Sequence, residues 1–550
     1  RSLPPAPLPA TLTHVEHHPM PDKPWYQEAV FFELNIRAYC DSNGDGIGDF
    51  RGAISKLDYI RSLGVDCIWV QPMYPSPRRD DGYDVADYTG IHPDLGTLDD
   101  FRAFLAAAHA KGMRVVIDLV MNHCSDQHPW FQAARQDRHS PYRDYFVWSD
   151  TPDKYSAARI IFLDVETSNW SYDEVAGQYF WHRFFHHQPD LNYDNPSVHQ
   201  EMFRILRFWL DMGIDGFRAD AVPYLYEREG TNCENLPETH AFLKQVRRLI
   251  DEEYPGRVLI AEANQWPWDL LPYFGNGDEF QVCFHFPIMP RLYMALKRAD
   301  KTPIVNILAD TPPIPPGTQW MTFLRNHDEL TLEMVTPEDR QWMWDNYAPE
   351  PRMRLNLGIR RRLLPLLDGD RRRWLALNAL FLSLLGTPIL YYGDEIGMGD
   401  NIWLEDRDGS RTPMQWSDAP NAGFSTAAST YLPVIDQAPY DYRQVNVAAQ
   451  ENDPDSYLAW TRFLVAARQG QPALRSGDLA WVETGDDAVL AYRRQSADGA
   501  VLCLVNLSDS ARPAGVDLER DMRDLLSREG RVYHAGAVII LAPYAAHWLV

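Results

Sequence analysis

RVVIDLVMNH (Arg114–His123) is a nearly continuous apolar run that ends in an amide and an imidazole. Parallel strands that are buried on both faces of a sheet have this composition. IDGFRAD (Ile214–Asp220) and VLIAE (Val258–Glu262) repeat the pattern, and each ends in a carboxylate. A helical stretch follows each of the three runs, so the repeating unit is a buried strand and then a helix.

Eight units of this kind follow one another along the chain. Their strand-like runs are Ala29–Arg37, Asp66–Pro72, Arg114–His123, Ile214–Asp220, Val258–Glu262, Glu279–Phe286, Met321–Asp328 and Thr387–Tyr392. Eight β-then-α units predict the α/β class and a (β/α)₈ TIM barrel, in which the chemistry takes place where the strands meet the following loops. A doubly wound open sheet is the alternative, but eight units favour closure.

Two of the predicted helices carry start and stop signals. Thr97 precedes LDDFRAFLAAAHA with an acidic residue three positions on, and Gly112 follows the helix. Ser197 and Gln200 form a second predicted capping box, and Gly213 ends the helix after it. In a capping box the first and fourth side chains satisfy free N–H groups of the first turn, so both patterns predict where a helix begins.

Two segments depart from the strand–helix rhythm. Residues 124–188, after the third strand, are too long and too aromatic for a simple loop and predict a small inserted domain over the barrel mouth. Residues 470–550 contain short alternating strands and predict a separate antiparallel β-sandwich domain. The predicted organisation is a flexible leader (1–21), a first barrel part (22–123), the inserted domain (124–188), a second barrel part (189–469) and the C-terminal domain (470–550).

The composition argues against several partners and locations. The 550 residues carry 52 basic and 77 acidic side chains, a formal charge of −25, whereas nucleic acid and anionic membrane surfaces require a basic footprint. The longest apolar stretch, Trp374–Tyr392, is interrupted by polar residues and predicts a buried helix and strand rather than a membrane span. The six cysteines are scattered without a CxxC pair, which argues against disulfides and zinc and favours a reducing cytoplasm. The sequence leaves open whether the chain forms a homo-oligomer.

Acids, histidines and arginines gather at four strand ends. The motifs are DLVMNH (Asp118–His123), GFRAD (Gly216–Asp220), IAEAN (Ile260–Asn264) and FLRNHDE (Phe323–Glu329). Any one of them alone is explained equally well as a helix cap or a salt bridge. Buried charged groups are unfavourable unless they are paired, so four such motifs in order indicate a functional site.

These motifs, with QPDLN (Gln188–Asn192), resemble the conserved regions of the α-amylase family of glycoside hydrolases and transglycosylases. Longer blocks resemble the members of that family that interconvert maltose and trehalose; they are Tyr226–Lys244, Ala261–Pro267, Phe323–Thr336 and Tyr391–Trp416. The resemblance extends from about Asp22 to the end of the chain. Spacing alone predicts a barrel with carboxylates, and chemistry on glucosides is what the resemblance implies.

The resemblance implies three catalytic carboxylates. Asp220 is the expected nucleophile, Glu262 the general acid/base, and Asp328 the group that binds sugar hydroxyls and stabilises the distorted ring. Retaining enzymes hold the first two roughly 5–5.5 Å apart. Arg218, two residues before Asp220 and so on the same strand face, is expected to keep that carboxylate ionised and oriented. Glu262 must keep its proton near neutral pH, which implies a pKa raised by burial and by neighbouring carboxylates.

Further residues match the sugar contacts of the family. Asp80 and Tyr83 are expected to bind and to stack on the terminal glucose. Asn264 is expected to face the second sugar, and Arg407 and Arg411 to help close the pocket. The residues expected to make polar contacts with the first ring are His123, Gln188 and His327. Without the family pattern, ordinary structural roles would be favoured for the histidines and for Tyr83.

The loop DSNGDGIGD (Asp41–Asp49) predicts a cation site. Oxygen-bearing side chains alternate with glycine turns, a pattern that suits a hard ion such as Ca²⁺. Gly52 stands where an EF-hand would have its glutamate, so the loop is not an EF-hand. The alternative is a plain turn built by Asx and glycine residues. The expected ligands are Asp41, Asn43, Asp45, the carbonyl of Ile47, and Asp49.

The resemblance also implies a second calcium site, where the inserted domain meets the barrel. Its expected ligands are Asn122, Asp190, Glu227 and the carbonyls of Tyr224 and Leu225. Both ions are expected to be structural, because neither catalytic step requires a metal, and no organic cofactor is expected.

Three functions compete for these residues. The resemblance implies an isomerase that interconverts maltose and trehalose by a retaining double displacement, through a covalent glucosyl-enzyme with trapped glucose, and with some hydrolysis as a side reaction. An α-glucosidase or oligo-1,6-glucosidase shares the barrel and the carboxylates and is the alternative. A catalytically inactive relative, such as a transporter heavy chain or a sugar-binding module, is disfavoured because all three carboxylates are present. Isomerisation requires a lid, for which the inserted domain and the connections 329–370 and 393–450 are the candidates.

Overall fold

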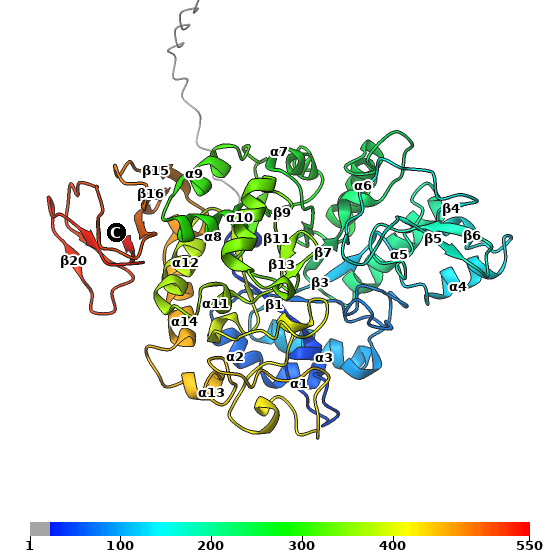
Figure 1. The fold of residues 1–550 in the computed structure, drawn as a ribbon, viewed down its shortest axis with the longest axis horizontal. Coiled ribbons are helices and arrows are strands. Elements are labelled where there is room, and N and C mark those ends of the chain that lie inside the picture. The colour runs from blue at the N-terminus through cyan, green and yellow to red at the C-terminus, as the bar shows by residue number, and fades with distance from the viewer. Residues whose placement is uncertain (1–22) are drawn as a thin grey trace, which may run out of the picture.

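Eight parallel strands close into a barrel in the computed structural model, which describes residues 23–550 (Figure 1). The strands, in their order around the barrel, are β1 (Phe31–Leu34), β2 (Cys67–Val70), β3 (Arg114–Val120), β7 (Gly216–Asp220), β8 (Val258–Ala261), β9 (Val282–Phe284), β10 (Gln319–Phe323) and β14 (Thr387–Tyr391). Each lies in a predicted run, except that β10 begins at Gln319 rather than at Met321. The (β/α)₈ barrel is confirmed and the open sheet is excluded. The predicted leader, residues 1–21, lies outside the described residues.

Helices follow the strands and form the outer layer of the barrel. The main ones are α1 (Phe50–Ser55), α2 (Leu57–Ser62), α3 (Leu98–Ala110), α5 (Pro196–Asp211), α6 (Pro237–Glu253), α8 (Ile288–Arg298), α9 (Thr302–Ala309), α12 (Arg371–Ser383) and α14 (Tyr457–Gln469). Further helices lie in the connections; these are α7 (Pro267–Leu270), α10 (Pro337–Tyr347), α11 (Leu363–Leu366), α13 (Val447–Gln450) and α15 (Pro472–Ser476). The apolar stretch Trp374–Tyr392 falls in α12 and β14, as predicted. Within residues 23–550, no helix has the length and apolar character that a membrane crossing requires.

The structure confirms one predicted helix start and corrects the other. Thr97 caps α3, and both hydrogen bonds of its capping box with Asp100 are present. The capping box predicted at Ser197 is wrong, because the cap lies two residues earlier and α5 begins at Pro196. The cap is Asn195, whose side chain accepts a hydrogen bond from the N–H of Ser197. Proline favours the first helical position, where no N–H is needed, and this preference moves the cap back.

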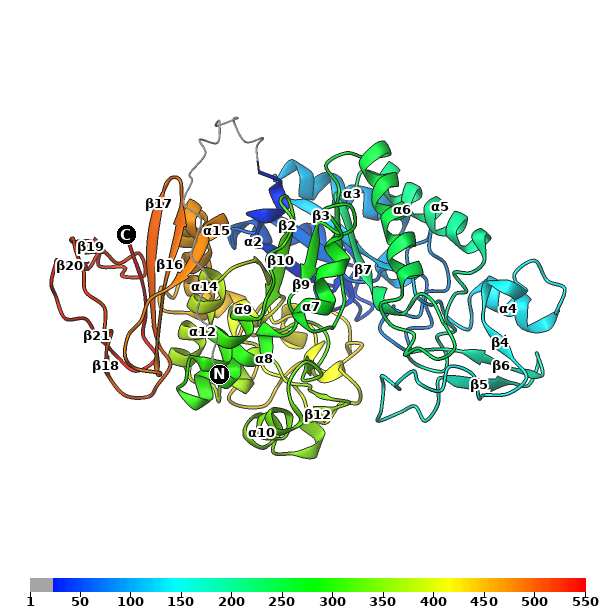
Figure 2. The same ribbon diagram turned by 90° about the horizontal axis from the view of Figure 1, so that it is seen from above.

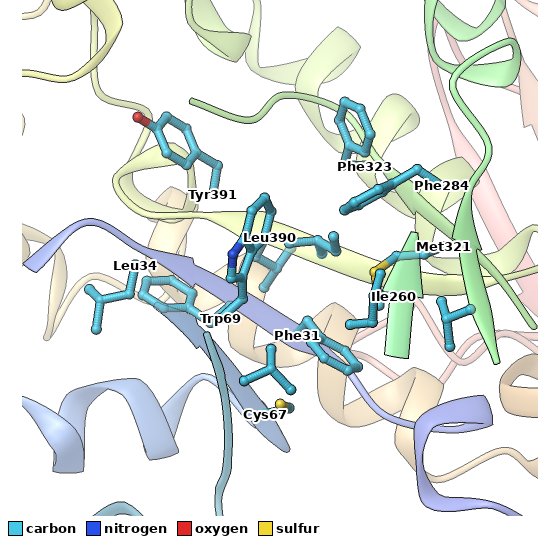
Figure 3. Packing of buried hydrophobic residues seen from close by; sticks show 14 of the residues in the cluster. Phe31, Leu34, Cys67, Trp69, Ile260, Phe284, Met321, Phe323, Leu390 and Tyr391 are labelled. Atoms are coloured by element: carbon cyan, nitrogen blue, oxygen red, sulfur yellow. The ribbon is translucent and has the colours of Figure 1, made fainter. Parts of the chain in front are cut away.

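The inside of the barrel is filled with apolar side chains. Phe31, Trp69, Phe284 and Met321 come from four different strands, and Figure 3 shows their side chains meeting between the strands. All four are buried. Layers of this kind make the barrel a packed core rather than a pore, so a substrate has access only at its rim.

Two smaller regions lie at opposite ends of the long axis (Figures 1 and 2). The segment 124–188 contains α4 (Pro129–Gln136) and a small antiparallel sheet of β4 (Trp148–Ser149), β6 (Gln178–Trp181) and β5 (Trp170–Asp173). The C-terminal region holds the antiparallel sheet β15 (Asp478–Trp481), β16 (Val489–Ser496), β17 (Gly499–Asn506) and β22 (Ala546–Leu549). An apolar cluster lies between this sheet and two ribbons, formed by β18 (Arg512–Pro513) with β21 (Ile540–Leu541) and by β19 (Met522–Arg523) with β20 (Val532–Tyr533). The predicted antiparallel C-terminal domain is therefore confirmed.

A second small sheet lies in the connection after β10. It consists of β11 (Leu330–Thr331), β13 (Gly358–Ile359) and β12 (Arg354–Leu355), and all of its pairs are antiparallel. β12 and β13 form a hairpin, residues 354–359, that we call the roof hairpin. Sequence patterns did not predict it, because each of its strands has only two residues.

Candidate active site

Three carboxylates surround one buried guanidinium at the C-terminal end of the barrel strands. Arg218, on β7, is 1% exposed, and its Nη1 lies 2.6 Å from Oδ1 of Asp118 and 2.6 Å from Oδ1 of Asp220. Its Nη2 lies 2.7 Å from Oε1 of Glu262, which follows β8. Arg218 and Asp220 share a strand face, as their spacing predicted. We call these four residues the floor of the site.

The two predicted catalytic carboxyls lie on the same guanidinium. Asp220 contacts Nη1 of Arg218 at 2.6 Å and Glu262 contacts Nη2 at 2.7 Å, and Oε2 of Glu262 accepts the N–H of Ala221 at 3.1 Å. Ala221 has a left-handed φ of 51°, an unfavourable conformation for alanine of the kind that clusters at functional sites. Inverting glycosidases separate their carboxyls by roughly 6.5–9.5 Å to admit a water molecule, whereas retaining enzymes hold them closer. Two carboxyls held by one guanidinium lie close together, which favours retaining chemistry.

Burial sets opposite protonation states for the two groups. Desolvation, opposed by the positive charge of Arg218, raises the pKa of Asp220 to about 6 and that of Glu262 to about 8. Near neutral pH, Asp220 is therefore ionised and Glu262 is protonated. This arrangement provides one group that can attack and one that can donate a proton.

Asp328 follows β10 and lies between two guanidinium groups and the buried imidazole of His327. Its Oδ1 lies 2.8 Å from Arg407 and 3.1 Å from Arg411, and its Oδ2 lies 3.2 Å from Nε2 of His327. Burial would raise the pKa of Asp328, but His327 and the two arginines outweigh it and hold the pKa below its usual value. The third carboxylate is therefore ionised while Glu262 keeps its proton.

The carboxylates open into a cavity of about 120 Å³. Its apolar wall consists of Ile161, Phe162, Phe184 and Phe286. The first three of these side chains come from the inserted segment, so that segment covers part of the pocket.

Most of the predicted sugar contacts line this pocket. The ring of Tyr83 stacks on His327, with centroids 5.2 Å apart and planes inclined by 6°. Nε2 of His123 and Oδ1 of Asn264 are buried without a hydrogen-bond partner in residues 23–550, although buried polar atoms are usually paired. These two atoms are therefore available to sugar hydroxyls. The predicted contacts found in the lining are Asp80, Tyr83, His123, Asn264 and His327.

Arg407 also lines the pocket, whereas Gln188 and Arg411 support the lining from behind. Nη2 of Arg407 lies 2.7 Å from Asp80 and its Nη1 lies 2.8 Å from Asp328, so Arg407 bridges two acids across the pocket. Gln188 does not line the pocket but donates a hydrogen bond to Oδ2 of Asp80 at 2.8 Å. Arg411 also lies outside the lining and contacts Asp328.

Several residues of the site were not predicted. Asp118 pairs with the central guanidinium, and Oε1 of Glu33 lies 2.5 Å from Nδ1 of His327. Both acids lie in runs that the sequence identifies as strands. An acidic residue inside a predicted buried strand was the signal that could have identified them as site residues. Phe162 and Glu333 reach the pocket from loops, where no local pattern marks them.

Contacts across the pocket join the inserted segment to the barrel loops. Nε of Arg159 lies 2.8 Å from Glu234, and its Nη1 lies 2.7 Å from Glu333. Its Nη2 donates to the hydroxyl of Tyr224 at 3.2 Å. We call the covering segments, residues 158–166 and 329–360, the roof of the site. Segments of this kind exclude water from a reaction when they are closed.

The ligand set of the second predicted calcium site fits a cation. Oδ1 of Asn122, Oδ2 of Asp190 and Oε1 of Glu227 are buried, and none has a hydrogen-bond partner in the part of the chain that the structure describes. Desolvation raises the pKa of Asp190 to about 8. A calcium ion would satisfy these oxygens together with the predicted carbonyls of Tyr224 and Leu225. Among the described residues no three His, Cys, Asp or Glu side chains gather as a metal cluster, and this set contains only two carboxylates.

The oxygens of the first predicted calcium loop are hydrogen bonded within the loop. Asp41 accepts the N–H of Asn43 at 2.9 Å, and Asp45 accepts the N–H of Ile47 at 2.8 Å. Asp49 caps α1 with its side chain. A calcium loop and a plain Asx turn are both compatible with these bonds, so the ion at this loop stays a prediction.

The fold and the site define the class of protein. The model of the α-amylase catalytic domain matches residues 35–477, and a domain of unknown function, DUF3459, matches residues 477–548. The chain belongs to the α-amylase family.

Particular relatives narrow the comparison. The trehalose synthase/amylase TreS of Mycobacterium tuberculosis is 57% identical over 91% of this chain and 84% of its own length. The trehalose synthase of Pimelobacter sp. is 56% identical over 90% and 89%. An oligo-1,6-glucosidase of Parageobacillus thermoglucosidasius is only 32% identical, over 89% and 91%. Among solved structures, trehalulose synthase MutB from Pseudomonas mesoacidophila MX-45 has a TM-score of 0.79 and 30% identity, and covers 96% of this chain and 100% of its own.

Proposed function

We propose that this chain is an isomerase that interconverts maltose and trehalose by moving a glucosyl unit within one bound disaccharide. The observation that carries the proposal is the pair of carboxyls of Asp220 and Glu262, held on the one buried guanidinium of Arg218 beneath the roof. The names of the relatives support the choice of reaction, because trehalose synthases reach 57% identity and glucosidases 32%.

The first half of the reaction breaks the bond of maltose. A carboxylate oxygen of Asp220 attacks the anomeric carbon of the non-reducing glucose, and Glu262 gives its proton to the departing glycosidic oxygen. The ion pair of Arg218 with Asp220 orients the nucleophile, and Asp328 binds hydroxyls of the distorted ring. The products of this half are a covalent glucosyl-enzyme and one free glucose.

The second half forms the new bond. The free glucose turns over in the pocket and presents its anomeric hydroxyl to the glucosyl-enzyme. Glu262, now ionised, takes the proton of that hydroxyl, and the oxygen displaces Asp220 from the anomeric carbon. The product has an α,α-1,1 bond, and both carboxyls return to their starting states.

The roof determines how often water, rather than the retained glucose, reacts with the glucosyl-enzyme. Water that reaches the glucosyl-enzyme would release a second glucose in place of trehalose. The aromatic wall of Phe162 and Phe184 and the bridge made by Arg159 lie where they hinder entry of water and loss of glucose. Some hydrolysis is still expected as a side reaction.

The test is to incubate the protein with pure maltose and to separate the sugars by chromatography. The proposal predicts trehalose as the main product, with glucose as a minor one. An α-glucosidase would give mostly glucose, and an inactive relative would leave maltose unchanged. Either of these results would overturn the proposal.

We also propose structural calcium at both predicted sites. The buried oxygens of Asn122, Asp190 and Glu227 support the second site. A chelator should lower the melting temperature of the protein, and added calcium should restore it. Elemental analysis should find two calcium ions per chain in the wild type and one in Asp190→Asn. Metal-free protein with an unchanged melting temperature would contradict both sites.

The proposed location is the cytoplasm. The six cysteines, all of which lie in the described residues, are buried and unpaired, as expected of a protein from a reducing compartment. Cell fractionation tests the location, and recovery of the protein outside the cytoplasm would contradict it.

A further inference from the structure

We infer that the roof hairpin, residues 354–359, joins the separate loops of the roof, and that Asn356 at its tip is the positioning residue that keeps glucose in the pocket. This inference rests on the proposed function, since it concerns the choice between isomerisation and hydrolysis. It adds a contact to the roof beyond the bridge made by Arg159.

Asn356 contacts the inserted segment and the pocket wall at the same time. Its backbone N–H donates to Oδ2 of Asp164 at 2.7 Å, and its Oδ1 accepts the N–H of Asp164 at 3.4 Å. Its Nδ2 donates to Oε1 of Glu329 at 3.1 Å. Glu329 lines the pocket and follows Asp328 directly. One side chain therefore connects the exposed roof loop to the wall beside a predicted catalytic carboxylate.

The backbone of the hairpin suits this role. Asn356 has a left-handed φ of 49°, which asparagine tolerates better than most residues. At Gly358, an added Cβ would lie 2.5 Å from Cγ of Glu329 and 2.9 Å from the carbonyl oxygen of Leu330. The hairpin is therefore packed so closely on Glu329 that only glycine fits at this position.

The hairpin also holds the loop that carries Arg407. Arg360, directly after β13, donates from Nη1 to the carbonyl oxygens of Leu404 at 3.0 Å and Asp406 at 2.6 Å. Arg407 then contacts both Asp80 and Asp328. The inserted loop and the connection after β14, which are distant in the sequence, thus meet at the hairpin and at Arg360 beside it.

The contact between Asp164 and Asn356 is where the inserted loop can separate from the roof hairpin. Asp164 is exposed and touches neither the floor nor the pocket, so its removal leaves the reacting groups in place. Without it, the loop that carries Ile161 and Phe162 loses its attachment to the hairpin. Water then enters and glucose leaves more often before the second half of the reaction is complete.

The experiment compares Asp164→Ala, Asn356→Gly and the double variant, with Asp153→Ala as a matched control. Asp153 is also an exposed aspartate of the inserted segment. Glycine at position 356 permits the left-handed backbone and keeps the N–H, so it removes only the side-chain contacts. Each protein is incubated with maltose, and the ratio of released glucose to trehalose is measured beside the melting temperature.

We expect Asp164→Ala and Asn356→Gly each to raise the ratio of glucose to trehalose about three- to tenfold, the change expected for loss of one ordinary hydrogen bond. The melting temperature should change little. The double variant should exceed either single variant, because Asp164→Ala removes the acceptor of the Asn356 N–H whereas Asn356→Gly removes the side-chain contacts with Asp164 and Glu329. Asp153→Ala should match the wild type.

Unchanged ratios in both single variants would overturn the inference, as would an equal rise in Asp153→Ala. If Asn356→Gly fails to fold, Asp164→Ala decides alone, because its side chain is exposed. A wild type that makes no trehalose would overturn the proposed function itself. A wild type that makes trehalose, with variants that behave identically to it, would overturn only the role of the hairpin.

Discussion

The floor and the roof of the pocket are held together by different means. In the floor, the Arg218 guanidinium is 1% exposed and contacts three carboxylates that are carried on or directly after barrel strands. In the roof, side chains from distant loops meet near the surface, and the contact of Asp164 with Asn356 spans 192 positions of sequence. The floor is a buried cluster of ion pairs, and the roof is an assembly of polar contacts nearer the surface.

This difference between the floor and the roof should separate the rate of maltose consumption from the choice of product. Removing one partner of a buried ion pair leaves an uncompensated charge and is strongly unfavourable, whereas exposed pairs contribute about 0–1 kcal/mol. Changes in the floor should therefore abolish the reaction towards every product. Changes in the roof should leave maltose consumption largely intact and alter what is made.

The largest effect is expected for Asp220→Asn. An amide cannot attack the anomeric carbon, so the rate of maltose consumption should fall by on the order of 10⁴-fold or more for both products. The rate is measured beside the melting temperature, which reports whether the protein is folded. Interconversion at the wild-type rate by the folded variant would contradict the assignment of the nucleophile.

The next effect concerns pH. Asp220 must be ionised, so activity should fall as the pH decreases through about 6, and Glu262 must be protonated, so activity should fall as the pH rises through about 8. The pH profile of kcat/KM should therefore be bell-shaped. Glu262→Gln should reduce the rate about 10²- to 10⁴-fold and abolish the alkaline limb. An alkaline limb that persists in this variant would show that another group is the acid.

A smaller effect, of a different kind, is expected in the roof. Arg159→Gln loses the ion pairs with Glu234 and Glu333, and should raise the ratio of glucose to trehalose about tenfold, as for the loss of one or two charge-assisted hydrogen bonds. Asn264→Ala should raise the ratio less, because its one side-chain hydrogen bond, to Thr331, is neutral. Maltose consumption should change only a few-fold. An unchanged product ratio in both variants would contradict a trapped intermediate.

The smallest effect is expected from a change in the barrel scaffold, outside both the floor and the roof. Thr97→Ala removes the cap of α3 and should lower the free energy of unfolding by about 1 kcal/mol. Neither the rate near the optimum pH nor the product ratio should change, because α3 contributes no residue to the pocket. A changed product ratio would show that the roof responds to general loss of stability, and would contradict a separate role for the roof.

The same two regions differ in how far the sequence predicted them. The barrel and the floor are encoded locally, because each catalytic carboxylate follows an apolar run and Arg218 lies two positions before Asp220. The cap of α5 was missed although its signal, Asn195 before Pro196, is also local. The roof could not be predicted in this way. Arg159 and Asn356 acquire their roles only when loops far apart in the sequence meet, and no periodicity marks such residues.

The most direct test of the account is whether the glucose that leaves maltose is the glucose that returns. Unlabelled maltose is incubated with the wild-type protein in a large excess of carbon-13-labelled free glucose, and the trehalose is analysed by mass spectrometry. A closed roof over a covalent glucosyl-enzyme predicts trehalose that is essentially free of label. Trehalose with one labelled ring, in proportion to the label in the medium, would contradict it.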